Sequence, residues 1–255
     1  MSEQWRLLRH GARSAYENMA IDEAILRCVT AQTSPPTLRF YRWQPSAVSI
    51  GYFQGIEQEV DLEACAARGV DVIRRLTGGG AVYHDYEGEI TYSLAIPEDY
   101  PGIPHKILDS YGILCQGLIV GLRSLGMPAE FKPINDIIVN GRKISGNAQT
   151  RRFRGILQHG TLLCEVDAPL MFTLLKVPNE KIRDKLIASV EERVTSIKRE
   201  MGAVDRERVT QAMIDGFAEA LDIRFVPGDL SDHEHALAQT LREENYATNT
   251  WNYKR

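Results

Sequence analysis

The chain has little cysteine: four residues in 255, at positions that match neither a disulfide framework nor a metal site. It contains no Cys-x-x-Cys and no His-Glu-x-x-His, so a structural or hydrolytic zinc centre is not expected. It also lacks the Gly-x-x-x-x-Gly-Lys-Ser/Thr, Gly-x-Gly-x-x-Gly and Gly-x-Ser-x-Gly patterns. The sequence therefore excludes a P-loop, a Rossmann fingerprint and an α/β-hydrolase nucleophile elbow.

Long apolar runs are missing too. No stretch approaches the roughly 18 apolar residues that a membrane-spanning helix needs, and the first residues carry no apolar leader, so we expect a cytoplasmic protein that does not bind membranes. A net charge of −4 argues against a nucleic-acid binder. One local basic cluster is either a solvated face or a guide for anionic ATP and an acidic partner domain: Arg142, Lys143, Arg151, Arg152 and Arg154.

Three consecutive glycines stand out between two strand-like runs, in the segment from Arg74 to Asp85. Consecutive glycines lose much backbone entropy on folding, so they are best explained where the chain bends sharply or approaches a ligand closely. Bare N–H groups and nearby guanidinium groups suit phosphate or carboxylate oxygens. The segment predicts an anion-binding cradle, and the alternative is a glycine-rich hairpin turn.

A second motif lies between Asn135 and Gly146, where an Asn-Gly pair separates two short runs that can pair as strands. It predicts a hairpin with a two-residue turn. Strict alternation would send Lys143 and Ser145 to one face and Ile144 to the other. Lys143 is a candidate catalytic residue on a rigid strand, although a lysine there is often only solvated.

These motifs resemble the lipoate–protein ligase and octanoyltransferase family, whose relatives include biotin–protein ligase. The resemblance covers nearly the whole chain, and within the family the chain is most similar to the short lipoate–protein ligases. The matching segments are 19–24, 50–54, 74–85, 135–146 and 158–162. The resemblance implies an α+β fold, a mixed β-sheet flanked by helices like the biotin/lipoate ligase catalytic domain.

The resemblance also implies roles for individual residues. Lys143 would contact the acyl carbonyl, Asp136 could bind Mg²⁺, and Asn135 would be its neutral polar neighbour. The residues expected to bind substrate or nucleotide are Arg75, Gly78, Gly79, Gly80, Ala81, Val82, Tyr83, His84, Tyr52, Asn135, His159, Gly160 and Thr161. An apolar slot should hold the acyl tail near Val82 and Ile50.

Histidine titrates near neutral pH, so His84 and His159 are also candidates for proton transfer. Each could equally be an ordinary hydrogen-bonded structural residue. Asp85, Glu87 and Glu89 follow as a charged turn, which we expect to be solvated.

The cysteines separate two chemistries within the family. An octanoyltransferase of this family passes the acyl group through an enzyme cysteine, because a thiolate is both a good nucleophile and a good leaving group. No cysteine occupies the loop 127–136 or precedes the His159-Gly160 pair. Cys28, Cys65 and Cys115 look like core residues, and Cys164 alone lies near the motifs.

We therefore expect an ATP-dependent lipoate–protein ligase, which activates lipoate or octanoate as acyl-AMP with Mg²⁺ and transfers it to a lysine of a lipoyl domain. The alternative is a cysteine-independent octanoyl or lipoyl transferase that uses a carrier protein or a lipoyl protein as donor. A third possibility is an inactive homologue that only binds lipoyl domains.

The expected organisation is a single catalytic domain over residues 1–255, with a helical extension from about residue 225 and no large C-terminal accessory domain. A small separate accessory subunit could complete it, or it could act alone. The patterning predicts helices over 19–30, 107–125, 169–175, 179–188, 206–221 and 231–245. It predicts strands over 38–41, 47–50, 70–75, 81–84 and 90–96, in addition to the hairpin.

Overall fold

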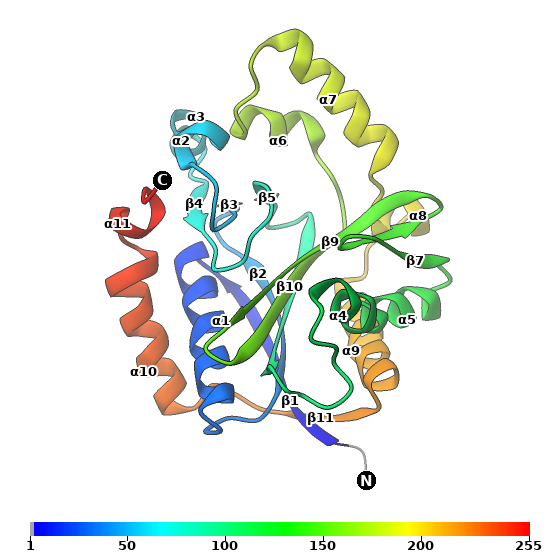
Figure 1. Ribbon diagram of the computed structural model, residues 1–255. Coiled ribbons are helices and arrows are strands. Elements are labelled where there is room, and N and C mark those ends of the chain that lie inside the picture. Colours follow the sequence, from blue (N-terminus) through cyan, green and yellow to red (C-terminus); the bar gives the residue numbers. More distant parts are fainter. Residues whose placement is uncertain (1–2) are drawn as a thin grey trace.

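A large mixed sheet forms the centre of the molecule, and a smaller sheet lies above one of its ends (Figure 1). The computed structural model describes residues 3–255. The large sheet has the order β11-β1-β2-β6-β10-β9-β8-β7, with β1 parallel to β11 and β2 and the other neighbours antiparallel. Its strands are β1 (Glu3–Arg13), β2 (Thr37–Trp43), β6 (Glu89–Pro97), β7 (Ala129–Lys132), β8 (Asp136–Val139), β9 (Arg142–Arg152), β10 (Gly155–Leu163) and β11 (Ile223–Pro227).

The small sheet has the order β4-β3-β5, with β3 parallel to β4 and antiparallel to β5. Its strands are β3 (Ala47–Ile50), β4 (Asp71–Arg74) and β5 (Val82–His84). The glycine segment is thus the connection between two strands of this sheet. The predicted α+β architecture, a mixed sheet flanked by helices, is confirmed.

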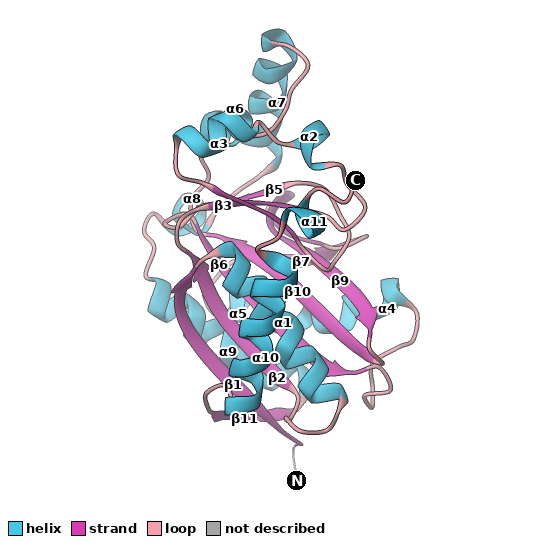
Figure 2. Cartoon of the chain, turned by 90° about the vertical axis from the view of Figure 1, so that its left-hand side faces the viewer, coloured by secondary structure: helices cyan, strands magenta, loops and turns pink. Residues whose placement is uncertain are grey.

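Helices cover both faces of the large sheet (Figure 2). On one face α1 packs with α10 and η1, and on the other α5 packs with α9. Both hydrophobic cores share the central strands, so β6 is buried along almost its whole length. The helical elements are α1 (Ala15–Thr30), α2 (Ile56–Glu59), α3 (Leu62–Ala67), α4 (Ile107–Leu114), α5 (Gln116–Ser124), α6 (Ala168–Leu174), α7 (Glu180–Arg193), α8 (Ile197–Met201), α9 (Arg206–Leu221), α10 (Asp232–Leu241), the π-helical η1 (Arg242–Tyr246) and α11 (Asn249–Asn252).

The sequence patterns located most elements and missed a few. The predicted ranges 47–50 and 206–221 coincide with β3 and α9. Strand β1 was not predicted, and the predicted helix over 107–125 is two helices that meet at Cys115. Gly112 and Gly117 flank this junction, and glycine is a poor helix former. Within residues 3–255, no helix is long and apolar enough to cross a membrane.

A buried ion pair joins α1 to the large sheet. Arg39 of β2 and Asp22 of α1 lie 2.7 Å apart, and their side chains are 0% and 2% exposed. Asp22 also accepts hydrogen bonds from Ser93 and Tyr41. Burial acts to raise the pKa of Asp22, but Arg39, His159 and Ser93 outweigh it and hold this pKa below its ordinary value. Asp22 is therefore a buried, fully partnered carboxylate.

Removing one partner of this pair should be strongly destabilising, because the other charge would stay buried without compensation. We expect Arg39→Met to lower the free energy of unfolding by roughly 3–5 kcal/mol, measured by urea denaturation. The control is Arg9→Met, whose partner Glu207 is 73% exposed, and whose loss should cost less than about 1 kcal/mol. Equal effects of the two substitutions would contradict this account.

Candidate active site

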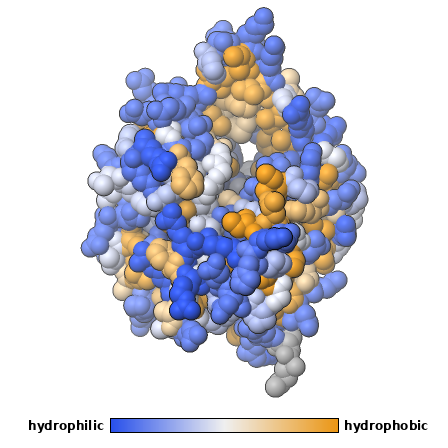
Figure 3. Space-filling model, viewed as in Figure 1, coloured by the Kyte–Doolittle hydropathy of each residue, from blue (hydrophilic) through white to orange (hydrophobic). Residues whose placement is uncertain are grey.

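A cavity of about 370 Å³ lies between the small sheet, strands β9 and β10, and the arm formed by α6 and α7. In the surface view, a hollow opens below this arm, and hydrophobic surface borders part of it (Figure 3). The predicted site residues that line the cavity are Arg75, Gly79, Gly80, Ala81, Val82, Tyr83, His84, Asn135, Lys143, His159, Gly160 and Thr161. The tertiary structure therefore brings both sequence motifs to one place.

Three predicted residues do not line the cavity. Gly78 belongs to the glycine loop but lies outside the cavity wall, and its carbonyl accepts a hydrogen bond from Arg75. The ring of Tyr52 packs against Arg152 and Lys254 instead. Asp136 stands beside the cavity and contacts it only through its ion pair with Lys143. The prediction that Tyr52 faces the site is corrected, because its side chain points to the C-terminal segment.

Arg75 shapes the glycine loop. Its guanidinium donates to the carbonyls of Gly78 and Gly80, both at 2.8 Å, and to the backbone and hydroxyl oxygens of Ser49, both at 3.1 Å. It is 5% exposed, and among the described residues it forms no ion pair with a carboxylate. Burial lowers the pKa of Arg75 to about 10, which still leaves it charged at neutral pH. The cavity thus contains an uncompensated positive charge.

The neighbouring Arg74 has a structural role. Its backbone N–H and guanidinium bond to Asn252, and the guanidinium also bonds to the Trp251 carbonyl. The Trp251 indole donates back to the Arg74 carbonyl. Consecutive residues of a strand point to opposite sides. One arginine of the pair therefore holds the C-terminal segment, and the other faces the cavity.

Lys143 reaches the cavity from the β8–β9 hairpin, whose predicted Asn-Gly turn is confirmed. Asn140 and Gly141 have φ angles of 50° and 78°, as a tight two-residue hairpin turn requires. Lys143 pairs with Asp136 at 2.7 Å. The strict alternation that we predicted does not hold, because the pairing register shifts between Ile137 and Ile138. This irregularity leaves Lys143 at the cavity and buries Ser145 away from it.

The predicted Mg²⁺ ligand stays a prediction. Asp136 is the residue predicted to bind Mg²⁺, and its carboxylate forms an ion pair with the Lys143 ammonium. Throughout residues 3–255, no group of three or more His, Cys, Asp or Glu side chains could hold a metal ion. Asn135 instead exchanges hydrogen bonds with Asn147, a cavity residue that sequence reasoning did not identify.

His159 lies at the inner end of the cavity. Its Nε2 is 2.7 Å from the Thr77 hydroxyl, and its Nδ1 is 3.7 Å from Asp22, too far for a hydrogen bond. Burial lowers the pKa of His159, which the nearby Asp22 only partly offsets. His159 is therefore neutral at pH 7 and contributes to the site through hydrogen bonding.

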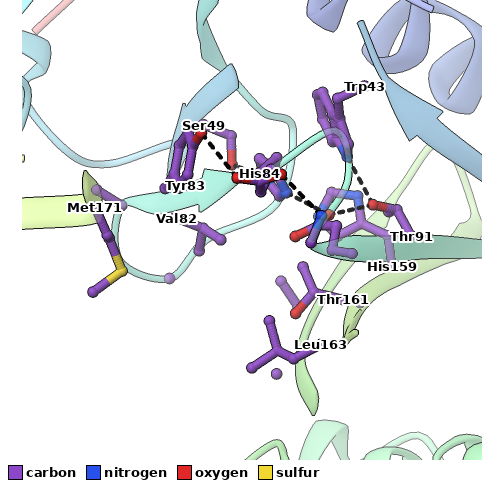
Figure 4. Close-up of a pocket in the computed structure, with 18 of the residues that line it drawn as sticks. Trp43, Ser49, Val82, Tyr83, His84, Thr91, His159, Thr161, Leu163 and Met171 are labelled. Carbon is purple, nitrogen blue, oxygen red and sulfur yellow. Dashed lines mark hydrogen bonds and ion pairs between the residues drawn. The ribbon is translucent and has the colours of Figure 1, made fainter. Parts of the chain in front are cut away.

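His84 also lines the cavity and stacks on Trp43, with ring centroids 4.1 Å apart (Figure 4). Its Nδ1 contacts Glu89 and its Nε2 contacts Ser49, both at 2.8 Å. The prediction that Glu89 is solvated is wrong, since this residue is 2% exposed. Glu89 begins the central strand β6, and its carboxylate is buried together with its partner His84.

The four cysteines are buried and free. None of them lines the cavity. Burial raises the pKa of Cys65 to about 11 and the pKa values of Cys115 and Cys164 to about 12. They are protonated core residues, including Cys164, the one closest to the motifs in sequence.

The motif analysis did not identify several cavity residues as site residues. They are Met19, Tyr41, Trp43, Ser49, Glu89, Thr91, Asn147, Leu163, Met171, Val190 and Val194. Met19 had a signal, since it opens the matching segment 19–24. Ser49 had one available signal, since it directly precedes the Ile50-Gly51 motif. The others are apolar or common residues whose positions depend on the fold. The acyl slot expected near Val82 and Ile50 stays a prediction. Val82 and Ser49, the neighbour of Ile50, line the cavity, whereas Ile50 itself lies in the core of the small sheet.

Residues 14–218 match the family described as "Lipoyl protein ligase A/B catalytic domain". The chain belongs to this family. It is 41% identical to octanoyltransferase LipM of Kyrpidia tusciae, across 99% of this chain and 100% of that relative. It is 37% identical to octanoyltransferase LipM of Brevibacillus brevis, across 99% and 100%.

Among solved structures, the chain resembles a bi-partite lipoate protein ligase from Thermoplasma acidophilum, which was studied with its E2 lipoyl domain. The TM-score is 0.89 and the identity 35%, over 98% of this chain and 96% of that one. The predicted lipoate ligase-like catalytic fold and the predicted lipoate–protein ligase and octanoyltransferase family are therefore confirmed. The chain is thus similar in sequence to proteins named octanoyltransferase and in structure to a protein named lipoate protein ligase.

The predicted ATP-dependent ligase is corrected by these relatives, which bear the name octanoyltransferase. The absence of a site cysteine had favoured a ligase, and the expected Mg²⁺ ligand Asp136 beside Asn135 was consistent with it. Neither observation decides the chemistry. Asn135 is bonded to the backbone of Asn147 and Asp136 to Lys143, and acyl transfer can proceed without a thiolate when the oxyanion is stabilised.

A side chain added at Gly51 should clash with the backbone of the glycine loop. A Cβ atom on Gly51 would lie 2.0 Å from the Gly79 carbonyl oxygen, whereas one on Gly11 would meet nothing within 4 Å. We expect Gly51→Ala to lower the free energy of unfolding by roughly 1–3 kcal/mol through overpacking. Gly11→Ala should change it by less than about 0.5 kcal/mol. Urea denaturation measures both, and a neutral Gly51→Ala would refute the contact.

Proposed function

We propose that this chain is a cysteine-independent octanoyltransferase. It takes an octanoyl group from the thioester of a carrier protein and passes it to the side-chain amine of a lysine in a lipoyl domain. The observation that carries the proposal is the meeting of Lys143, Arg75 and the glycine loop in one cavity, in a chain whose relatives are octanoyltransferases.

The cavity suits a fatty acyl chain. Apolar side chains from β5, from the end of β10 and from the α6–α7 side form part of its wall: Val82, Leu163, Met171, Val190 and Val194. Binding sites for small molecules are typically apolar with a few convergent polar groups. The octanoyl tail would lie against these side chains, and its carbonyl would lie toward Lys143.

The reaction requires stabilisation of a developing oxyanion. The nucleophile adds to the thioester carbonyl carbon, the carbonyl oxygen gains negative charge, and the C–S bond then breaks to release the carrier thiol. The Lys143 ammonium and the backbone N–H groups from Gly79 to Val82 are the donors available to that oxygen. Donors fixed in position before the reaction stabilise such charge without reorganisation.

No enzyme thiol takes part in this scheme. All four cysteines are buried and lie outside the cavity wall. A thiol whose pKa is raised to about 12, as for Cys115 and Cys164, carries almost no thiolate at neutral pH. The acceptor is a lipoyl domain, as predicted. ATP and Mg²⁺ have no step in this reaction, and a separate accessory subunit remains a prediction.

The proposal is tested by mass spectrometry of an apo lipoyl domain mixed with this protein and octanoyl-carrier protein, without ATP. We expect the domain to gain one octanoyl group. A parallel reaction contains free octanoate with Mg·ATP and no carrier. A mass gain only in that second reaction would overturn the proposal.

Loss of Lys143 should abolish most transfer, because no other ammonium lines the cavity within the described chain. We expect Lys143→Ala to lower the transfer rate by at least about 100-fold, the usual cost of one oxyanion donor. The exposed Lys106→Ala is the control and should keep the wild-type rate. Initial rates with octanoyl-carrier protein measure both. Full activity of Lys143→Ala would contradict this role.

Thiol-directed reagents should leave the native enzyme active. Because all four cysteines are buried with raised pKa values, iodoacetamide under native conditions should modify none of them appreciably. The transfer rate after treatment should equal that of an untreated sample, and a mass spectrum should show no alkylation. Rapid inactivation that tracks alkylation of a single cysteine would show that a thiol does carry the acyl group.

A further inference from the structure

We propose that Ser49, His84 and Glu89 form a catalytic triad, and that the Ser49 hydroxyl carries the octanoyl group between the donor and the lipoyl domain. This inference rests on the proposed transferase function and names its nucleophile. All three residues line the cavity, and they come from β3, β5 and β6.

The geometry is that of an activated serine. The Ser49 Oγ lies 2.8 Å from His84 Nε2, and His84 Nδ1 lies 2.8 Å from Glu89 Oε1 (Figure 4). A nucleophile bonded to a base, which a carboxylate in turn orients, is the arrangement that recurs in acyl transfer on unrelated folds. Since Glu89 accepts from Nδ1, His84 holds its proton there and leaves Nε2 free to accept from Ser49.

The surroundings fix this array. Trp43 stacks on the His84 ring, and its indole N–H donates to Thr91, whose hydroxyl donates to Glu89 at 2.5 Å. The second carboxylate oxygen of Glu89, Oε2, is buried without a hydrogen-bond partner. Glu89 therefore orients the His84 ring through Oε1, the oxygen that also accepts from Thr91.

Arg75 completes the activation of Ser49. Its guanidinium donates to Ser49 Oγ at 3.1 Å, and it lacks a carboxylate partner within residues 3–255. A cation next to a hydroxyl favours the charge that develops as the proton leaves. The hydroxyl is thus held between a base that takes its proton and a cation that stabilises its oxygen.

The competing array around His159 is less suited to this task. Thr77 contacts His159, but Thr77 does not line the cavity, and His159 is 3.7 Å from Asp22. Ser49 is buried and belongs to the cavity wall. Unlike the Thr77 hydroxyl, its hydroxyl therefore borders the space that an acyl group would occupy.

The reaction has two balanced halves. First, the Ser49 oxygen bonds to the thioester carbonyl carbon, its proton passes to His84 Nε2, and the C–S bond breaks as the leaving sulfur takes that proton. An octanoyl ester on Ser49 and a free carrier thiol result. Second, the neutral lysine amine of the lipoyl domain attacks the ester carbonyl carbon, and its proton passes to His84 Nε2. The C–O bond then breaks as the Ser49 oxygen takes that proton from His84, which leaves an octanoyl amide and the free Ser49 hydroxyl. No oxidant or other reactant is needed.

The test is to mix the protein with octanoyl-carrier protein without acceptor, quench it with acid, and locate the acyl group by peptide mass spectrometry. We expect a gain of one octanoyl group on the peptide that contains Ser49, lost again when apo lipoyl domain is added. Ser49→Ala should give no acyl-enzyme and a transfer rate lower by at least about 100-fold.

Three further variants separate catalysis from folding. Ser49→Cys should regain an acyl-enzyme, because a thiol beside His84 is again a nucleophile. Glu89→Gln should slow acylation while thermal unfolding shows a folded protein. Ser110→Ala removes another buried serine, far from the triad in the α4 helix, and should acylate normally.

The outcomes distinguish the triad from the proposed function. Wild-type transfer without any acyl group on Ser49, or with a fully active Ser49→Ala, would overturn the triad and leave the transferase standing. Absence of transfer by the wild type, with Ser49 acylated, would overturn the transfer to lipoyl domains and keep Ser49 as the nucleophile. Absence of both would overturn both.

Discussion

Arg75 is a buried cation whose hydrogen bonds all go to neutral oxygens: two carbonyls of the glycine loop, the Thr77 hydroxyl, and the backbone and side chain of Ser49. These bonds replace the water that the guanidinium lost on burial. They also hold the loop against β3 and leave the positive charge unneutralised at the cavity. The shape of the cradle and its affinity for an oxyanion thus follow from the same side chain.

Lys143 supplies the second cation in a different way. It is more exposed than Arg75 and is paired with Asp136, on a hairpin whose register is broken by an irregularity. In the proposed reaction, Arg75 would orient the nucleophile beside the small sheet, and Lys143 would meet the carbonyl oxygen from the large sheet.

The polar residues of the site lie at the junction of the two sheets, and each sheet contributes part of them. The small sheet contributes Ser49, His84 and the glycine loop, and the large sheet contributes Glu89, His159 and Lys143. Across this junction Glu89 of the large sheet is bonded to His84 of the small sheet, and His159 of the large sheet contacts Thr77 of the glycine loop. The α6–α7 arm adds apolar wall and encloses the site from the remaining side.

The sequence by itself determined the family, the α+β fold, the hairpin with Lys143 and the glycine loop, because these depend on short-range patterns: glycines, an Asn-Gly turn and regular hydrophobic spacing. Only the tertiary structure decided that Arg74 holds the C-terminal segment, that Glu89 is buried, that Tyr52 points away and that Ser49 meets His84. These facts depend on contacts between residues far apart in the chain, such as Arg74 with Asn252, and no local pattern records them.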